Sequence, residues 1–219
     1  FNDYDGYGAS ELDANTTLWV NGENAVLTVK SINNNGVIEV YDNGSFAVNS
    51  NVTNNGDIIL EAGSSITGPE NMDVVVGNDD QEVIYENGKY VVVDKFFAAQ
   101  IGADKYETLQ DAINAAVNGD TITLINNVAI SGTTINLNKS ITINGNGFTI
   151  DAQKKSRIFH IESGANVVLN NIIFLNGVSG DCGGAVLSDG NVDIAGSHFI
   201  NNTASADGGA VYMESGTVT

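Results

Sequence analysis

The sequence predicts an all-β protein in which short strands coil into stacked rungs, a β-solenoid, and three observations lead to that fold class. The block Gly-Gly-Ala-Val occurs at residues 183–186 and again 25 residues later, at 208–211. Nearer the N-terminus, apolar runs that begin at Thr17, Val37 and Asp57 recur every 20 residues. Thirty asparagines and 25 glycines, against one proline, suit many tight turns because both residues tolerate left-handed backbone conformations.

Residues 1–76 are predicted to form a first array with rungs of 20 residues. Apolar residues alternate within each run, which is the pattern of a strand with one buried face, and three runs per period describe a coil with three faces. The first two units close at 33–36 and 53–56. Leu18, Ile38 and Ile58 are predicted to stack on one another in consecutive rungs. The side chains predicted to point inwards are Leu18, Val20, Val26, Thr28 and Ile32 in the first rung; Ile38, Val40, Phe46, Val48 and Val52 in the second; and Ile58, Leu60 and Ile66 in the third.

Residues 77–100 are predicted to be a connector that contains a hairpin, because Asn87-Gly88 lies between two β-rich runs within 83–92. A capping α-helix is predicted at 108–118, with Thr108 as N-cap, Gly119 as its stop and one apolar face. Solenoid ends expose strand edges that aggregate unless covered, so we expect this helix to close the second array. A helix of a βαβ unit is the weaker alternative, because no alternating helices follow.

Residues 101–219 are predicted to form the second array, with rungs of about 25 residues whose neighbours bury one another's inward side chains. We interpret the chain as a fragment of a longer protein, because it has no initiator Met and stops partway through a repeat. One rung is predicted to place these apolar residues inwards: Ile161, Val167, Leu169, Ile172 and Phe174. Their counterparts in the next rung are Val186, Val192, Ile194 and Phe199. In the preceding rung, Ile141, Ile143 and Phe148 are predicted to match Val167, Leu169 and Phe174.

Charge excludes two classes of partner. The chain has 27 acidic and 8 basic residues, a net charge of -19, whereas nucleic-acid binding draws most of its affinity from Lys and Arg. An acidic surface also repels anionic lipid, and no segment approaches the roughly 18–20 apolar residues of a membrane span. The lone Cys182 is interpreted as a packing or turn residue and not as a nucleophile.

Two segments carry a family resemblance. Residues 108–124 resemble the opening segment of right-handed parallel β-helix proteins of the pectate-lyase-like superfamily. The Gly-Gly-Ala-Val blocks, with Phe-Ile-Asn-Asn at 199–202, resemble the GGA[ILV] and FxxN repeats of polymorphic outer-membrane proteins and adhesin-like surface proteins, although 174–177 lacks the final Asn. The resemblance covers residues 101–219. It implies a right-handed β-helix on the cell surface, extracellular and non-catalytic, that attaches to a host or neighbouring-cell glycan or protein.

A polysaccharide lyase or hydrolase is the rival class, because such enzymes share this fold. A lyase needs a cationic base, and a hydrolase needs paired carboxylates. Lys154, Lys155 and Arg157 lie in a predicted loop, where solvated charge is the simpler interpretation. Neither His160 nor His198 has an evident carboxylate partner when mapped by the repeat. We therefore predict no catalytic residue and no enzyme activity.

Calcium is the one cofactor that the sequence brings into consideration. Asp181 and Asp207 lie next to the glycine pairs and are weak metal candidates, but they do not fall on the same rung position, and Asp beside Gly is usually turn chemistry. The remaining acidic candidates form no ladder either; they are Asp151, Asp189 and Asp193.

Trp19 is the candidate glycan contact. Because Leu18 and Val20 are predicted to point inwards, the indole between them should point outwards, where an aromatic face can stack on a sugar. The alternative is that Phe1, Tyr4 and Tyr7 fold back over it. Asn-x-Ser/Thr sequons suit a secreted protein, although chance accounts for about as many; they begin at Asn15, Asn43, Asn51, Asn138 and Asn201.

A third hypothesis is a self-assembling filament or surface-layer module, because solenoid ends offer parallel-strand edges for head-to-tail addition. Polymerisation would favour this assembly, release of unsaturated uronates from pectin-like polymers would favour a lyase, and a longer gene with more repeats and an anchor would favour an adhesin stalk.

Overall fold

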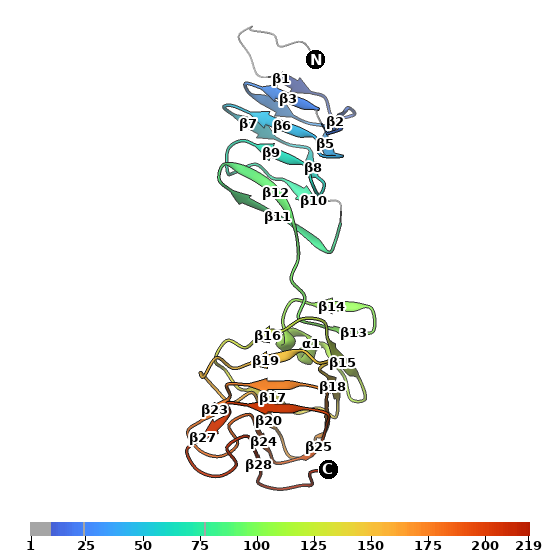
Figure 1. The fold of residues 1–219 in the computed structure, drawn as a ribbon. Coiled ribbons are helices and arrows are strands. Elements are labelled where there is room, and N and C mark those ends of the chain that lie inside the picture. The colour runs from blue at the N-terminus through green and yellow to red at the C-terminus, as the bar shows by residue number, and fades with distance from the viewer. Residues whose placement is uncertain (1–9, 24, 77) are drawn as a thin grey trace. The chain divides into compact units, whose positions relative to one another are not determined.

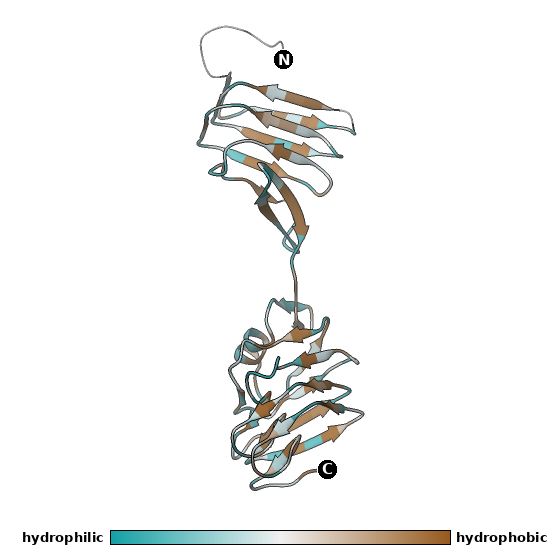
Figure 2. Ribbon diagram, turned by 60° about the vertical axis from the view of Figure 1, so that its left-hand side comes forward, coloured by the Kyte–Doolittle hydropathy of each residue, from teal (hydrophilic) through white to brown (hydrophobic). Residues whose placement is uncertain are grey.

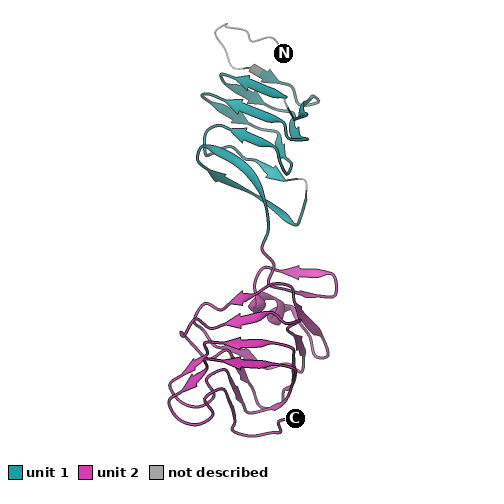
Figure 3. Cartoon of the chain, in the orientation of Figure 1, with its two compact units in different colours: residues 1–95 teal, residues 96–219 magenta. Residues whose placement is uncertain are grey.

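The computed structural model describes residues 10–23, 25–76 and 78–219 (Figure 1). The chain divides into two compact units, unit 1 over residues 1–95 and unit 2 over residues 96–219 (Figure 3). In both units, strands from successive rungs pair in parallel, and the described residues contain a single short α-helix. The predicted all-β solenoid is therefore confirmed.

Unit 1 has three faces, each a sheet built from one strand per rung. The stacked position predicted for Leu18, Ile38 and Ile58 is confirmed, since these residues are register partners in consecutive strands. The first sheet contains β1 (Ser10–Leu12), β4 (Ile32–Asn34) and β7 (Val52–Asn54); the second, sheet B, contains β2 (Thr17–Asn21), β5 (Val37–Tyr41), β8 (Asp57–Leu60) and β10 (Val75–Val76); the third contains β3 (Val26–Val29), β6 (Ser45–Val48), β9 (Ser65–Thr67), β12 (Lys89–Asp94) and β11 (Gln81–Glu86).

The inward residues of β3 differ from the prediction by one position. Leu27 and Val29 pair with Phe46 and Val48 of the next rung, whereas Val26 is 68% exposed. The connection from β2 to β3 is one residue longer than that from β5 to β6, and the following connection is one residue shorter. Because strand side chains alternate between faces, that shift alone turns Val26 and Thr28 outwards while the 20-residue period is kept.

Asparagine side chains bond neighbouring rungs in the repeated Asn-Asn-Gly segments of unit 1. The amide of Asn34 donates to Asn54 Oδ1 at 2.8 Å and to the Asp57 carbonyl oxygen at 3.1 Å, and its own Oδ1 accepts from Gly36 N. Asn34 is fully buried, so these bonds satisfy its polar groups. Gly56 follows in the next rung, where an added Cβ would lie 1.9 Å from the Gly36 oxygen.

The predicted hairpin is present and extends unit 1. Strands β11 and β12 pair antiparallel, and β12 pairs antiparallel with β9, so the hairpin continues the third sheet. Both turn residues, Asn87 and Gly88, have positive φ angles of 50° and 79°, as a two-residue type I′ turn requires. The hairpin thus covers the edge that β9 would otherwise expose.

Tyr90 of β12 fixes this hairpin to the preceding loop. Its hydroxyl donates to the Pro69 carbonyl oxygen at 2.6 Å and accepts from Met72 N at 2.8 Å, and the residue is buried. Burial is the largest influence on the hydroxyl and raises the pKa of Tyr90 above its ordinary value. Above a pH of about 10 an unfolded tyrosine has lost its proton while folded Tyr90 keeps it, so the free energy of unfolding should fall as pH rises further.

We therefore expect Tyr90→Phe to lower the free energy of unfolding of unit 1 by about 1–3 kcal/mol at neutral pH, because Met72 N loses its partner. The variant should also lose less stability than the parent when the pH is raised above about 10. Urea titration followed by the fluorescence of Trp19, the single tryptophan, measures both. Tyr212→Phe in unit 2 is the control; an equally steep alkaline loss in Tyr90→Phe would contradict the assignment.

Unit 2 also has three main faces, and apolar residues follow their strands while polar residues gather at the turns (Figure 2). In the first sheet, the edge of the first-rung strand β15 (Thr121–Leu124) is paired by a second antiparallel hairpin, formed by β13 (Ala99–Ile101) and β14 (Asp104–Tyr106). The first sheet contains β13 (Ala99–Ile101), β14 (Asp104–Tyr106), β15 (Thr121–Leu124), β18 (Thr142–Asn144), β21 (Asn166–Asn170) and β25 (Asn191–Ala195); the second contains β16 (Val128–Ala129), β19 (Thr149–Asp151), β22 (Ile173–Leu175) and β26 (His198–Ile200); the third contains β17 (Ile135–Leu137), β20 (Phe159–Ile161), β24 (Val186–Ser188) and β28 (Val211–Met213); β23 (Val178–Ser179) pairs with β27 (Thr203–Ala204).

The predicted helix is α1 (Leu109–Ala115), and it lies against β13, β14 and β15 at the first rung of unit 2. Thr108 caps it by accepting from Asp111 N at 3.1 Å. The helix ends earlier than the predicted residue 118, because Ala116 has an extended ψ of 148°. Lys139 Nζ donates to the carbonyl oxygens of Ile113 and Asn114 in the last turn. Its positive charge therefore caps the C-terminal end of the helix, several residues before Gly119. Its buried residues are Leu109, Ala112 and Ile113.

The register of unit 2 agrees with the prediction where the turns have equal length. Val186 pairs with Val211 and Phe174 with Phe199, both at 25 residues. Elsewhere the offset is 24 between β19 and β22 and 27 between β20 and β24, so Ile150, and not Phe148, lies beside Phe174. For the same reason Ile161 pairs with Ser188, and Val186 pairs with Phe159.

Candidate functional sites

The outward side of sheet B carries the most exposed aromatic side chain among the residues of unit 1 that the structure describes. Trp19, Glu39, Ile59 and Val75 are register partners across β2, β5, β8 and β10 and form one column. Trp19 is 62% exposed and Val75 is 46% exposed. Together with Asn21 and Tyr41, which pair in the same strands, these residues are called the Trp19 face.

Hydrogen bonds between neighbouring strands hold the polar groups of the Trp19 face. The indole Nε1 of Trp19 donates to the Glu39 carboxylate, and Asn21 Nδ2 donates to the hydroxyl of Tyr41 at 2.9 Å. The ring therefore stands on a rigid sheet with a carboxylate and an amide beside it. Such an arrangement can stack on the apolar face of a ligand and bond its hydroxyls. The predicted alternative cover, Phe1, Tyr4 and Tyr7, lies outside the described residues.

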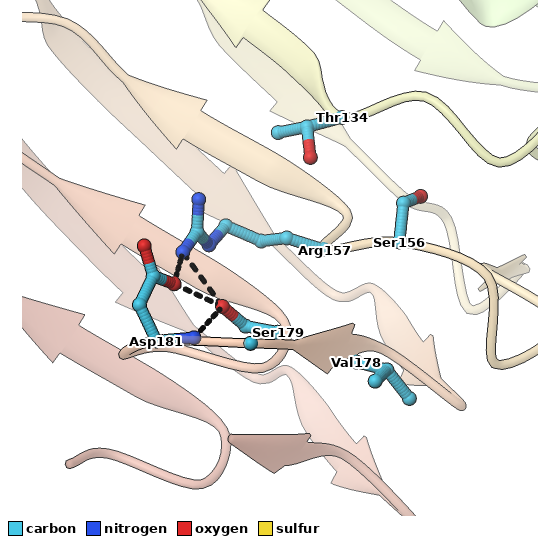
Figure 4. Close-up of a pocket in the computed structure, with 7 residues that line it drawn as sticks. Thr134, Ser156, Arg157, Val178, Ser179 and Asp181 are labelled. Atoms are coloured by element: carbon cyan, nitrogen blue, oxygen red, sulfur yellow. Dashed lines mark hydrogen bonds and ion pairs between the residues drawn. The ribbon is translucent and has the colours of Figure 1, made fainter. Parts of the chain in front are cut away.

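Arg157 is not the solvated loop charge that the sequence suggested. Its side chain is only 12% exposed and reaches the turn of the next rung. Nη2 donates to Ser179 Oγ at 2.8 Å and to the Asp181 carboxylate (Figure 4). Two backbone oxygens complete the contacts: Nε donates to that of Gly183 at 2.9 Å, and Nη2 donates to that of Cys182 at 2.7 Å. Sequence reasoning missed this because the partners lie 22–26 residues away, in a turn without a regular repeat.

Asp181, the first calcium candidate, is engaged by this cluster. Its Oδ1 atom accepts from Ser179 Oγ and from Arg157. The Ser179 hydrogen bond lowers the pKa of Asp181 most, partial desolvation opposes that effect, and the Arg157 charge lowers the pKa further, so the net shift is downwards. The second candidate, Asp207, is exposed and accepts a hydrogen bond from Gly183 N through its backbone oxygen. Within residues 10–23, 25–76 and 78–219, no three His, Cys, Asp or Glu residues gather as metal ligands.

A polar pocket of about 420 Å³ lies beside the Arg157 cluster. In the described part of the chain, the hydroxyl of Thr134 makes no hydrogen bond to protein, and neither does that of Ser156, whose Oγ atom is buried beneath the pocket wall. We call it the Arg157 pocket; it is lined by Thr134, Ser156, Arg157, Val178, Ser179, Gly180 and Asp181.

His160 has a carboxylate partner, contrary to the prediction. Its Nε2 atom lies 2.8 Å from Asp189 Oδ2, and the two side chains are 29% and 30% exposed. The 27-residue offset of this face sets His160 beside Leu187, two residues before Asp189, whereas a constant offset of 25 pointed to Ala185. Such a pair can accept a proton, but no nucleophilic side chain bonds to His160 within the described residues. His198 lies beside Ile173 in another sheet, as predicted.

The remaining candidates are surface features. Lys154 and Lys155 are exposed, and Lys155 Nζ donates to Gln153 Oε1. These two lysines are therefore solvated loop charges, as the sequence suggested, whereas Arg157 is not. Cys182 is a half-exposed free thiol whose carbonyl oxygen binds Arg157. The side chains at the start of all five sequons are exposed; they are Asn15, Asn43, Asn51, Asn138 and Asn201.

Comparison of the chain with protein-family models, with curated proteins and with solved structures gave no match. Among the described residues, no helix is both long enough and apolar enough to cross a membrane. The structure shows the β-solenoid fold, whereas the resemblance to adhesin-like proteins rests on the sequence repeats alone.

Proposed function

We propose that this chain belongs to a non-catalytic, extracellular, adhesin-like surface protein, and that unit 1 attaches it to a glycan on a host or neighbouring cell. The observation that carries the proposal is Trp19, which is 62% exposed on the outside of a regular sheet, with Glu39 and Tyr41 in the adjacent strand. Trp is enriched at binding interfaces because it combines a large apolar ring with a polar N–H group, and here polar side chains lie beside that ring.

The Trp19 face suits an extended glycan better than a compact small molecule. Its column runs across four strands, and neighbouring strands lie about 4.8 Å apart, so the face follows a polymer over several sugar rings. A sugar ring has apolar C–H faces that stack on the indole and hydroxyls that meet Glu39 and Asn21. The bond from Trp19 to Glu39 already restrains the indole, which reduces the entropy lost on binding.

The rest of the chain fits surface display. A solenoid extends by adding rungs and so acts as a spacer, and the exposed sequon asparagines suit a secreted protein. A net charge of -19 keeps such a surface soluble and disfavours anionic polymers as ligands. We therefore place neutral glycans first among the ligands of the Trp19 face.

The test is binding of the full chain to an array of neutral and acidic glycans, followed by calorimetry on the best ligand. Trp19→Ala should weaken that binding by about tenfold or more, equivalent to about 1.4 kcal/mol, and Trp19→Phe should retain part of it. Stability should change by no more than about 0.5 kcal/mol, because the side chain is exposed. Phe96→Ala, at another exposed aromatic residue, is the matched control. Unchanged affinity in Trp19→Ala, or no glycan bound above background, would refute the proposal.

A further inference from the structure

The Arg157 pocket of unit 2 is a second site of polar chemistry, separate from the Trp19 face. We propose that it binds one neutral sugar residue through a pair of adjacent hydroxyl groups. The pocket combines unused hydrogen-bonding atoms, balanced charge and a small volume.

Arg157 and Asp181 each keep one side free for a ligand. Among the described residues, the protein contacts of the guanidinium use Nε and Nη2, and Figure 4 shows the other terminal nitrogen pointing away from Asp181. The contacts of Asp181 use Oδ1, so Oδ2 accepts from neither Arg157 nor Ser179, and this side chain is 70% exposed. A donor and an acceptor, both ionised, therefore stand side by side.

A vicinal diol matches this pair. One sugar hydroxyl can accept from Arg157 Nη1 while its neighbour donates to Asp181 Oδ2, and bonds to ionised groups are stronger than those between neutral groups. Thr134 adds a hydroxyl that no described residue engages. Val178 contributes an apolar wall for the C–H side of a ring.

The charge balance selects a neutral ligand over an anion. Asp181 already compensates the guanidinium of Arg157, so the pocket has no excess positive charge with which to hold a carboxylate or phosphate. The net charge of -19 adds repulsion at long range. A neutral polyol escapes that repulsion and still uses both charged groups.

The dimensions limit the ligand to a small unit. At about 420 Å³, the pocket lies at the lower end of the range of about 300–1,000 Å³ typical of small-molecule sites. One sugar ring, alone or within a chain, fits this volume. Gly180 keeps one wall open, since a Cβ added there would meet no atom within 4 Å.

The test uses NMR of the ¹⁵N-labelled full chain with methyl α-mannopyranoside and methyl β-galactopyranoside as neutral probes, and sodium glucuronate and inorganic phosphate as anionic probes. A neutral glycoside should shift the amides of Thr134, Arg157, Ser179 and Gly180 saturably at millimolar concentration. Stronger binding of glucuronate or phosphate, or no saturable shift with any probe, would overturn the proposal.

Two variants probe the pocket while keeping the fold. Thr134→Val should weaken glycoside binding about 3- to 10-fold, as loss of one neutral hydrogen bond implies, whereas Thr142→Val on a strand outside the pocket should not. Asp181→Asn keeps an oxygen for Arg157 but loses the charge, and should weaken glycoside binding about tenfold. Glycoside affinity equal to that of the parent in both variants would also overturn the proposal. Trp19→Ala should leave these amide shifts unchanged. The proposal for the Arg157 pocket and the proposal for the Trp19 face are therefore tested independently of each other.

Discussion

Replacing Phe174 with alanine should lower the free energy of unfolding of unit 2 by about 3–5 kcal/mol, one of the largest effects expected in this chain. Phe174 is fully buried between its register neighbours. Its ring stacks on Phe199 with centroids 4.7 Å apart and meets Phe159 edge to face at 5.9 Å. Alanine would leave a cavity shared by three rungs, and none of them can close it alone, because strand pairing fixes the spacing of the rungs.

The chain contains its own reference for this measurement. Trp19, the single tryptophan, lies in unit 1, whereas circular dichroism near 218 nm follows the strands of both units. In Phe174→Ala the dichroism transition of unit 2 should move to lower denaturant, and the fluorescence transition of Trp19 should stay in place. Phe96→Ala removes the same side chain at a position that is 55% exposed and should cost no more than about 0.5 kcal/mol. A shift equal to that of Phe96→Ala would show that the Phe174 core is not as tightly packed as described.

The sequence predicts those parts of the fold that depend on a local pattern. Alternation and period together identified the stack of Leu18, Ile38 and Ile58 and that of Phe174 on Phe199, because an inward strand residue must meet its equivalent in the next rung. Thr108 was identifiable as a cap because capping needs only the next three residues. The errors at Val26 and Phe148 have one cause: a turn that gains or loses a residue moves the following strand by one or two positions.

The sites were harder to predict because they depend on turns. Arg157 reaches a turn in the next rung, and the partner of His160 lies just past the end of a strand whose offset is 27 and not 25. A period fitted to strands carries no information on where such side chains meet. Trp19 was the exception, since its exposure follows from alternation within its own strand. The 20-residue offset also places Glu39 beside Trp19, whereas the hydrogen bond between the two side chains is known from the structure.

Gly184→Ala should destabilise unit 2 by about 3 kcal/mol or more, although it adds a single methyl group. The second glycine of the first Gly-Gly-Ala-Val block lies directly against the next rung, where an added Cβ would be 2.3 Å from the Gly209 oxygen and 2.5 Å from the Thr203 oxygen. Both atoms belong to the backbone, so no side chain can move aside. The glycine before it, Gly183, has a φ of 61°, so the pair is required for two different reasons, backbone conformation and lack of space.

Gly180→Ala is the matched control, because it makes the same change four residues earlier, where an added Cβ meets no atom within 4 Å and φ is not positive. That variant should stay within about 0.5 kcal/mol of the parent. Urea titrations followed by dichroism measure both variants, with Trp19 fluorescence again reporting the unaffected unit 1. Since Gly184 N also donates to the Gly208 oxygen, hydrogen exchange at the amides of Gly184 and Ala185 should speed up in Gly184→Ala, as the rungs separate locally. Equal stability of the two variants would mean that the glycine pair repeats for a reason other than close contact between rungs.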